Sequence, residues 1–136
     1  MSSPKMTAIG LYPIPTGNNE LAGIVIEATE QLHALQQAII EAVNVYAQKV
    51  RGESVFVPDS SGTPFDPILF EYVDTFVPQQ TGERFNPHVT IGLAPLDWLK
   101  EREKKPFDTL TFGAKGIATY QLGNFGTASK RLELDD

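Results

Sequence analysis

The chain has 136 residues, the usual length of one domain, and we expect residues 1–136 to form a single domain. No cysteine is present, which excludes disulfides, thiolate zinc sites and a cysteine nucleophile, and two histidines are too few for a histidine-rich metal site. We expect no metal and no other cofactor, and the net charge of −6 disfavours an extended nucleic acid as a partner.

The N-terminal stretch MSSPKMTAIG lacks the apolar run of a signal peptide, and no run of about 18 apolar residues occurs further on. We therefore expect a soluble, cytoplasmic protein that does not bind a membrane. A small anionic ligand is compatible with the negative charge, because a few local donors are enough to hold it.

The first half of the chain predicts a hairpin followed by a helix. Residues 7–14 and 21–27 are apolar or β-branched, and the connecting TGNNE has turn composition. Thr29 is placed to cap a helix. That helix has one buried stripe, formed by residues that recur at steps of three and four: Leu32, Leu35, Ile39, Val43 and Tyr46.

Further elements follow at shorter intervals. Residues 53–57 predict a short strand, and Asp66 with Pro67 is typical of the cap and first position of a second helix, which reaches Phe76. Residues 86–94, NPHVTIGLA, predict a strand, and residues 95–104 a third helix. The charged run KEREKK in that helix favours a solvated face.

The last part of the chain predicts three strands, over residues 110–115, 116–122 and 130–134, with GNFGTA joining the last two. Strands interleaved with about three helices indicate an α+β domain with an antiparallel or mixed sheet.

His88 and Thr90 are the candidate catalytic residues. Alternation along a strand places His88, Thr90 and Gly92 on one face. The apolar residues between them, Val89, Ile91 and Leu93, point to the other face, which we expect to face helices. An imidazole exchanges a proton near neutral pH and a threonine hydroxyl donates to a phosphoryl oxygen, so the pair suits phosphoester or acyl chemistry. A polar strand face with a hydrogen-bonded histidine is the alternative interpretation.

The other histidine predicts no catalytic role. His33 lies with Gln37 and Asn44, away from the apolar stripe of its helix, so we expect a solvated surface position.

Three residues near the C-terminus are candidates for binding a substrate. Lys130 and Arg131 point to opposite faces of a strand, so at most one of them faces the His88 cleft, and Arg131 has the better geometry for a phosphate. An ordinary charge on an edge strand is the alternative for Arg131. Thr127 and the amides of residues 123–126 predict either an anion-binding nest or a plain turn.

The segment FNPHVTIGLA resembles the second H-x-T motif of the 2H phosphoesterase superfamily, which includes bacterial 2′-5′ RNA ligase-like proteins and cyclic nucleotide phosphodiesterases. The similarity extends over LAGIVIEATEQLHALQQAII and ATYQLGNFGTASKRL, from about Met6 to Leu134. It implies one half, the C-terminal half, of a bilobal fold.

The resemblance implies a phosphodiesterase for a 2′,3′-cyclic nucleotide or an RNA-terminal cyclic phosphate, with His88 as general acid or base and Thr90 on the phosphoryl oxygen. Members carry two such motifs and this chain carries one, because His33 is followed by Ala34 and Leu35 in a helix. Three alternatives stay open. Two chains complete one site in a homodimer, the chain binds a nucleotide or assembles without turnover, or a longer polypeptide supplies the missing lobe.

A missing lobe also has a consequence for assembly. Half of a bilobal sheet exposes strand edges and an apolar face that the other half would cover, and such surfaces associate. We therefore expect a homodimer or a higher oligomer.

Overall fold

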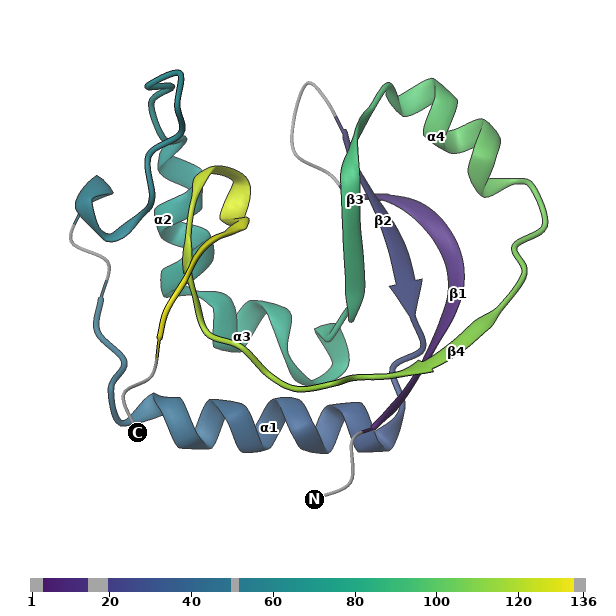
Figure 1. Ribbon diagram of the computed structural model, residues 1–136, viewed down its shortest axis with the longest axis horizontal. Coiled ribbons are helices and arrows are strands. Elements are labelled where there is room, and N and C mark those ends of the chain that lie inside the picture. The colour runs from purple at the N-terminus through teal and green to yellow at the C-terminus, as the bar shows by residue number, and fades with distance from the viewer. Residues whose placement is uncertain (1–3, 15–19, 50–51, 134–136) are drawn as a thin grey trace. The chain divides into compact units, whose positions relative to one another are not determined.

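The computed structural model describes residues 4–14, 20–49 and 52–133 and confirms an α+β fold (Figure 1). The described residues contain four α-helices, an antiparallel four-stranded sheet and a separate pair of strands. The chain divides into two compact units, one made of residues 1–37 and 82–115 and the other of residues 38–81 and 116–136. We describe each unit by itself.

The sheet of the first unit has the strand order β3-β2-β1-β4, with all neighbours antiparallel. Its strands are β1 (Lys5–Ile14), β2 (Glu20–Ile26), β3 (His88–Ala94) and β4 (Leu110–Gly113). The pairing of β1 with β2 confirms the predicted hairpin, although residues 15–19 of the connection lie outside the described residues. Within the described part of the chain, β3 and β4 are the terminal strands of this sheet.

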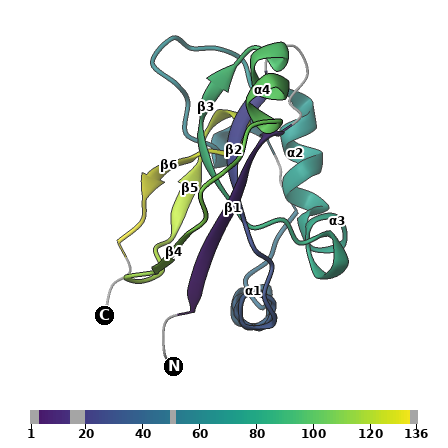
Figure 2. The same cartoon turned by 90° about the vertical axis from the view of Figure 1, so that its right-hand side faces the viewer.

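Helix α1 (Glu30–Asn44) begins where the sequence predicts it. The Thr29 hydroxyl oxygen accepts from the backbone N–H of Leu32 at 3.2 Å, which is the expected N-cap. Figure 2 looks along the axis of this helix. Its first turns supply Leu32 to the core cluster of the unit, together with Ala8 and Ile26.

The predicted buried stripe does not continue along the whole helix. Ile39 and Val43 are exposed, and Tyr46 lies beyond the last helical residue. Leu32 and Leu35 pack against the β1–β2 core, whereas the later stripe residues have no place in that cluster. The periodic pattern therefore predicted the helix correctly and its burial only in the first turns.

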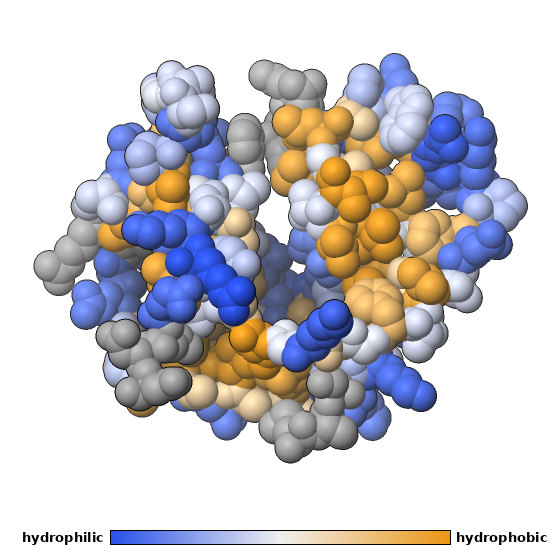
Figure 3. Space-filling model, viewed as in Figure 1, coloured by the Kyte–Doolittle hydropathy of each residue, from blue (hydrophilic) through white to orange (hydrophobic). Residues whose placement is uncertain are grey.

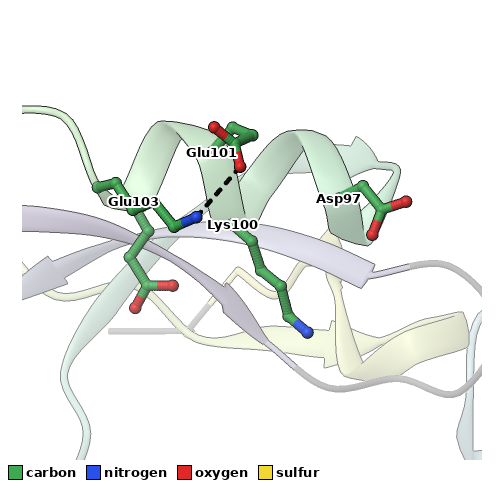
Figure 4. Close-up of a pocket in the computed structure, with 5 residues that line it drawn as sticks. Asp97, Lys100, Glu101 and Glu103 are labelled. Atoms are coloured by element: carbon green, nitrogen blue, oxygen red, sulfur yellow. Dashed lines mark hydrogen bonds and ion pairs between the residues drawn. The ribbon is translucent and has the colours of Figure 1, made fainter.

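Helix α4 (Leu96–Glu103) packs against β1, and its Leu99 is fully buried. The helix also carries charged side chains around a shallow hollow, among them Asp97, Lys100, Glu101 and Glu103 (Figure 4). The one interaction drawn there joins Lys104 Nζ to Glu101 Oε1 at 3.2 Å, between two largely exposed side chains. Exposed pairs of this kind contribute little to stability, so this surface is a solvated helix face, as predicted.

The second unit is built on aromatic packing. Its core consists of Phe56, Phe65 and Leu69, and helix α2 (Pro67–Asp74) supplies the leucine. Asp66 caps that helix through a 3.0 Å bond from the backbone N–H of Ile68, with Pro67 at the first position, as predicted. A short helix α3 (Phe76–Gln80), which the sequence did not predict as a separate element, follows directly.

Three predicted strands of this region differ in the structure. Residues 53–57 do not form a strand: Glu53–Val55 is a 3-10 turn closed by the Phe56 amide on the Glu53 carbonyl, and Val57 makes a single bridge to Gly123. The two C-terminal strands are shorter, β5 (Tyr120–Leu122) and β6 (Ala128–Arg131): residues 116–119 are not in a strand, and β6 begins at residue 128, just after the 3-10 turn Asn124–Gly126, and ends at residue 131. Residue 134 lies outside the described residues.

Truncating Leu99 tests the packing of α4 on β1. We expect Leu99→Ala to lower the free energy of unfolding of the first unit by about 2–5 kcal/mol, because the side chain is fully buried and leaves a cavity. Urea unfolding measures the change. Leu96→Ala, on the same helix at a site that is 37% exposed, is the matched control and should cost clearly less. Equal losses would show that α4 is not docked through Leu99.

The loop after residue 57 contains a carboxyl group, that of Asp59, whose hydrogen bonds make the loop sensitive to pH. Asp59 Oδ1 accepts from the Ser61 hydroxyl at 2.8 Å and from the Thr63 amide at 3.0 Å. These bonds lower the pKa of the carboxyl, the one from the Ser61 side chain most. Because the pKa of this carboxyl is lower in the folded than in the unfolded chain, its ionisation stabilises the folded loop at pH values above the unfolded pKa. That stabilisation is lost as the pH falls through the folded pKa.

An NMR titration checks this. The Ser61 and Thr63 amide shifts should move together, with a midpoint below the ordinary 3.8 of an aspartate, and Asp59→Asn should abolish the titration. A midpoint at or above the ordinary value contradicts the bonding pattern.

Candidate functional site

His88 and Thr90 share one face of the sheet, as predicted, and both are exposed. In the pairing of β2 with β3, His88 lies opposite Val25 and Thr90 lies opposite Gly23. Directly opposed residues of antiparallel strands have their side chains on the same face. Gly23 brings no side chain of its own beside Thr90, although it is buried.

The His88 ring is oriented by its own chain. Nδ1 lies 2.7 Å from the backbone carbonyl oxygen of Asn86. A carbonyl oxygen only accepts, so Nδ1 carries the proton in this contact, and the neutral ring has its lone pair on Nε2. This is the form in which an imidazole acts as a base through Nε2.

Two further polar side chains belong to this face. Tyr12 of β1 lies opposite Gly23, and its hydroxyl accepts from the side-chain amide of Asn86. The contact ties the segment before β3 to β1 across β2. Asn86 precedes His88 by two residues, so the alternation of side chains along a strand could have predicted that it lies on the same face. Nothing in the local sequence singled out Tyr12, since only the strand register brings it to this face.

A β-bulge changes the face of the residues that follow Thr90. Thr90 pairs with Gly23 and Gly92 pairs with Ala22, which leaves Ile91 as the extra residue. Gly92 has a φ of 150°, a backbone conformation that favours glycine. The prediction that Gly92 shares the face of His88 and Thr90 was therefore wrong, because strict alternation ends at the bulge. The prediction that Leu93 points to the opposite face was wrong for the same reason: Leu93 pairs with Leu21, two residues from Gly23, and so lies on the His88 face.

The apolar residues of β3 are not covered by helices, contrary to the prediction. Val89, Ile91 and Leu93 are 45%, 56% and 57% exposed. Figure 3 shows hydrophobic side chains gathered over β3 and the neighbouring strands. The helices of this unit pack elsewhere, α1 through the Ala8–Ile26 cluster and α4 on β1. Strand β3 therefore presents an apolar surface beside the catalytic candidates.

His33 lies on the other side of the sheet from His88. Its ring packs edge-on against Phe85, with the centroids 5.0 Å apart, and it is half-buried, so the predicted solvated position was wrong. Phe85 belongs to the cluster around Ile26, which follows Val25 in β2 and hence occupies the opposite face. His33 accordingly packs as a ring and does not reach the His88 face.

The first unit has a cleft of about 570 Å³, whose lining contains neither His88 nor Thr90. Gly10, Tyr12 and Val25, which line it, share the His88 face by register, whereas Leu11 and Ile24, which also line it, belong to the opposite face. The end of α4 and the residues after it also line the cleft, with the charged residues Arg102, Glu103 and Lys105 and with Pro106 and Phe107. A Cβ built on Gly10 would meet open space, so the floor of the cleft beside Val25 is unobstructed.

The three substrate-binding candidates near the C-terminus belong to the other unit. Lys130 pairs with Gln121 and Arg131 with Tyr120, which confirms that the two cations point to opposite faces, and both are exposed. The structure does not bring Thr127, Lys130 or Arg131 into one unit with His88 and Thr90.

The turn before β6 does not form an open nest of amides. Gly123 N–H donates to the Thr127 carbonyl, Gly126 N–H to the Gly123 carbonyl, and Thr127 N–H to the Asn124 carbonyl. The Thr127 hydroxyl donates to the same Asn124 carbonyl at 2.8 Å. These donors are engaged within the turn, which supports the interpretation as a plain connection between strands.

In the described parts of the chain, no three histidine or acidic side chains are grouped so as to hold a metal ion. No α-helix among the described residues is long and apolar enough to cross a bilayer. Comparison with family models, with curated proteins and with solved structures gave no significant match.

The ring orientation of His88 is directly measurable. We expect the neutral His88 ring to be the Nδ1–H tautomer, because the Asn86 carbonyl accepts from Nδ1. Nitrogen-15 NMR of the two rings at a pH where both are neutral distinguishes the tautomers, and His33→Gln assigns the signals. A His88 ring protonated at Nε2 contradicts the geometry.

Proposed function

We propose that the chain is a phosphodiesterase that opens a 2′,3′-cyclic phosphate of a nucleotide or an RNA end, at a site around His88 and Thr90 that a second copy completes. The bond from His88 Nδ1 to the Asn86 carbonyl carries the proposal, because it leaves Nε2 as the basic atom on an exposed strand face. The resemblance of FNPHVTIGLA to the H-x-T motif of 2H phosphoesterases supports the same chemistry.

In the proposed reaction, Nε2 of one His88 removes a proton from water as the water oxygen attacks phosphorus. The bond from phosphorus to one ribose oxygen breaks, and a protonated His88 of the second copy gives its proton to that oxygen. The product is a 2′- or 3′-monophosphate, and the two imidazoles have exchanged protonation states. Thr90 donates its hydroxyl proton to a non-bridging phosphoryl oxygen.

We propose a second copy as the source of the other imidazole, because this sequence offers none besides His88 to this face. The sequence contains two histidines, and the ring of His33 packs on Phe85 at the opposite face of the sheet. Removing one of two proton-transfer partners costs on the order of 100-fold or more in rate. Homodimers with twofold symmetry are the commonest way for a site to use one residue twice.

The cleft beside Val25 supports a small phosphorylated ligand. Arg102 and Lys105 line it together with Glu103, which leaves one net positive charge there, while the chain as a whole is negative. A local pair of cations suits one or two phosphates and does not suit a long polyanion, which needs many contacts.

One observation favours a second candidate function, binding of a nucleotide-like ligand without turnover. In the described part of the chain, the His88 face holds one imidazole together with hydroxyl and amide groups from Thr90, Tyr12 and Asn86. Such groups hold a phosphate through hydrogen bonds without transferring a proton to a leaving group.

An assay with 2′,3′-cyclic AMP separates the two functions. We expect the wild-type chain to form a 2′- or 3′-monophosphate, His88→Ala to lose about 100-fold or more of the rate, and Thr90→Val to lose on the order of 100-fold. Chromatography of the products measures the rates. His33→Gln is the control and should retain the wild-type rate, because that ring lies on the other face.

The outcome decides between catalysis and binding. Equal rates for wild type and His88→Ala, or no turnover by either, would contradict the proposed enzymatic function. Titration calorimetry with 2′-AMP then tests the second candidate, and unchanged affinity in a Thr90→Val, His88→Ala double variant would remove that as well.

A further inference from the structure

Strand β3 has free hydrogen-bonding groups at the residues of the site. The Ile26 N–H donates to the Pro87 carbonyl at 2.9 Å, which makes residues 26 and 87 a hydrogen-bonded pair of the β2–β3 ladder. Hydrogen-bonded and non-bonded pairs alternate in an antiparallel ladder, so His88 and Thr90 are at non-bonded positions. Their backbone N–H and C=O groups therefore point away from β2, at the terminal edge of the sheet in the described part of the chain.

Over His88–Thr90 this edge lacks the charged residues and proline that usually protect against strand pairing, and the bulge at Ile91 lies beyond those three residues. The seven residues of β3, HVTIGLA, include no lysine, arginine, acidic residue or proline. Val89 and Ile91 are about half exposed beside the free backbone groups. Two chains that each carry a net charge of −6 can approach each other here without bringing like charges together.

We propose that β3 pairs antiparallel with β3 of a second copy of this chain, about a twofold axis at Val89. The proposal rests on the proposed function, since it names the partner that completes the site. In this register His88 of each copy exchanges N–H···O=C bonds with Thr90 of the other, and the bonds use the groups that β2 leaves free.

The position of the axis follows from two constraints. Opposed residues must lie on the same face, so the axis has to fall on a residue and cannot fall between two. An axis at His88 would pair Thr90 with Asn86, whose carbonyl already accepts from the His88 ring. An axis at Val89 avoids this and sets each imidazole beside the hydroxyl of Thr90 from the other copy.

The geometry of the pair suits one phosphate. Strand separation and a two-residue offset put the two His88 Cα atoms roughly 8 Å apart on one continuous sheet face. Both imidazoles then face the same space, with a Thr90 hydroxyl directly across from each. On the opposite face the two copies of Val89 meet at the axis.

Cysteine cross-linking tests the register, and the absence of native cysteine gives a clean background. We expect Val89→Cys to form a covalent dimer under mild oxidation, because residues on the axis lie within the Cα separation of a disulfide, about 4.4–6.8 Å. Ile91→Cys and Leu93→Cys are matched controls on the same strand. In the proposed register their Cα atoms lie roughly 14 Å and 27 Å from their symmetry mates, beyond disulfide reach.

Accessibility cannot produce the expected order, because Val89 is 45% exposed and the two control positions are 56% and 57% exposed. Equal cross-linking at all three positions, or preference for residue 91 or 93, would overturn the register. Light scattering gives a second measurement: the wild type should be a dimer and Val89→Lys a monomer, since two lysines would meet at the axis. A wild-type chain that stays monomeric at high concentration overturns the pairing.

These results are separable from those of the enzyme assay. A cross-linked Val89→Cys dimer without cyclic phosphodiesterase activity would support the proposed interface and contradict the proposed enzymatic function. Turnover by a chain that neither cross-links at residue 89 nor dimerises would support the enzymatic function and contradict the interface.

Discussion

The hydrogen bond between His88 Nδ1 and the Asn86 carbonyl is the contact on which the proposed chemistry depends. It assigns the ring proton to one nitrogen and the lone pair to the other, since the carbonyl has no proton to give. The bond joins residues two apart in the chain, Asn86 just before β3 and His88 at its start, and is therefore a local feature. Asn86 is in turn bonded to Tyr12, so β1 helps to hold the carbonyl that orients the ring.

The β-bulge at Ile91 sets the limit of this site along β3. Before the bulge, regular alternation keeps His88 and Thr90 together on one face; after it, Gly92 pairs out of step with them. The same irregularity explains why an uninterrupted alternation of apolar and polar residues misplaced Gly92. A bulge is a property of two paired strands, and one strand's sequence seldom reveals it.

The sequence predicted best those features that depend on residues close together in the chain. Thr29 and Asp66 cap helices at the predicted positions because each bonds an amide two or three residues away. Predictions that needed distant partners were less successful. The covering of Val89 by helices and the solvated position of His33 were wrong, because which element packs on β3 or beside Phe85 depends on the whole sheet.

Several features of β3 together favour association through this strand. A strand edge with free backbone groups and half-exposed valine and isoleucine side chains carries a cost in solubility, which proteins usually offset with lysine, proline or a bulge close to the edge. Here the uncharged part coincides with His88 and Thr90, and the bulge follows immediately after them. An axis at Val89 would bury this edge where it is regular and leave the irregular part outside the pair. In that arrangement, the strand edge that is unprotected also carries the imidazole that needs a second imidazole for the proposed reaction. Assembly and chemistry would therefore depend on the same three residues, His88, Val89 and Thr90.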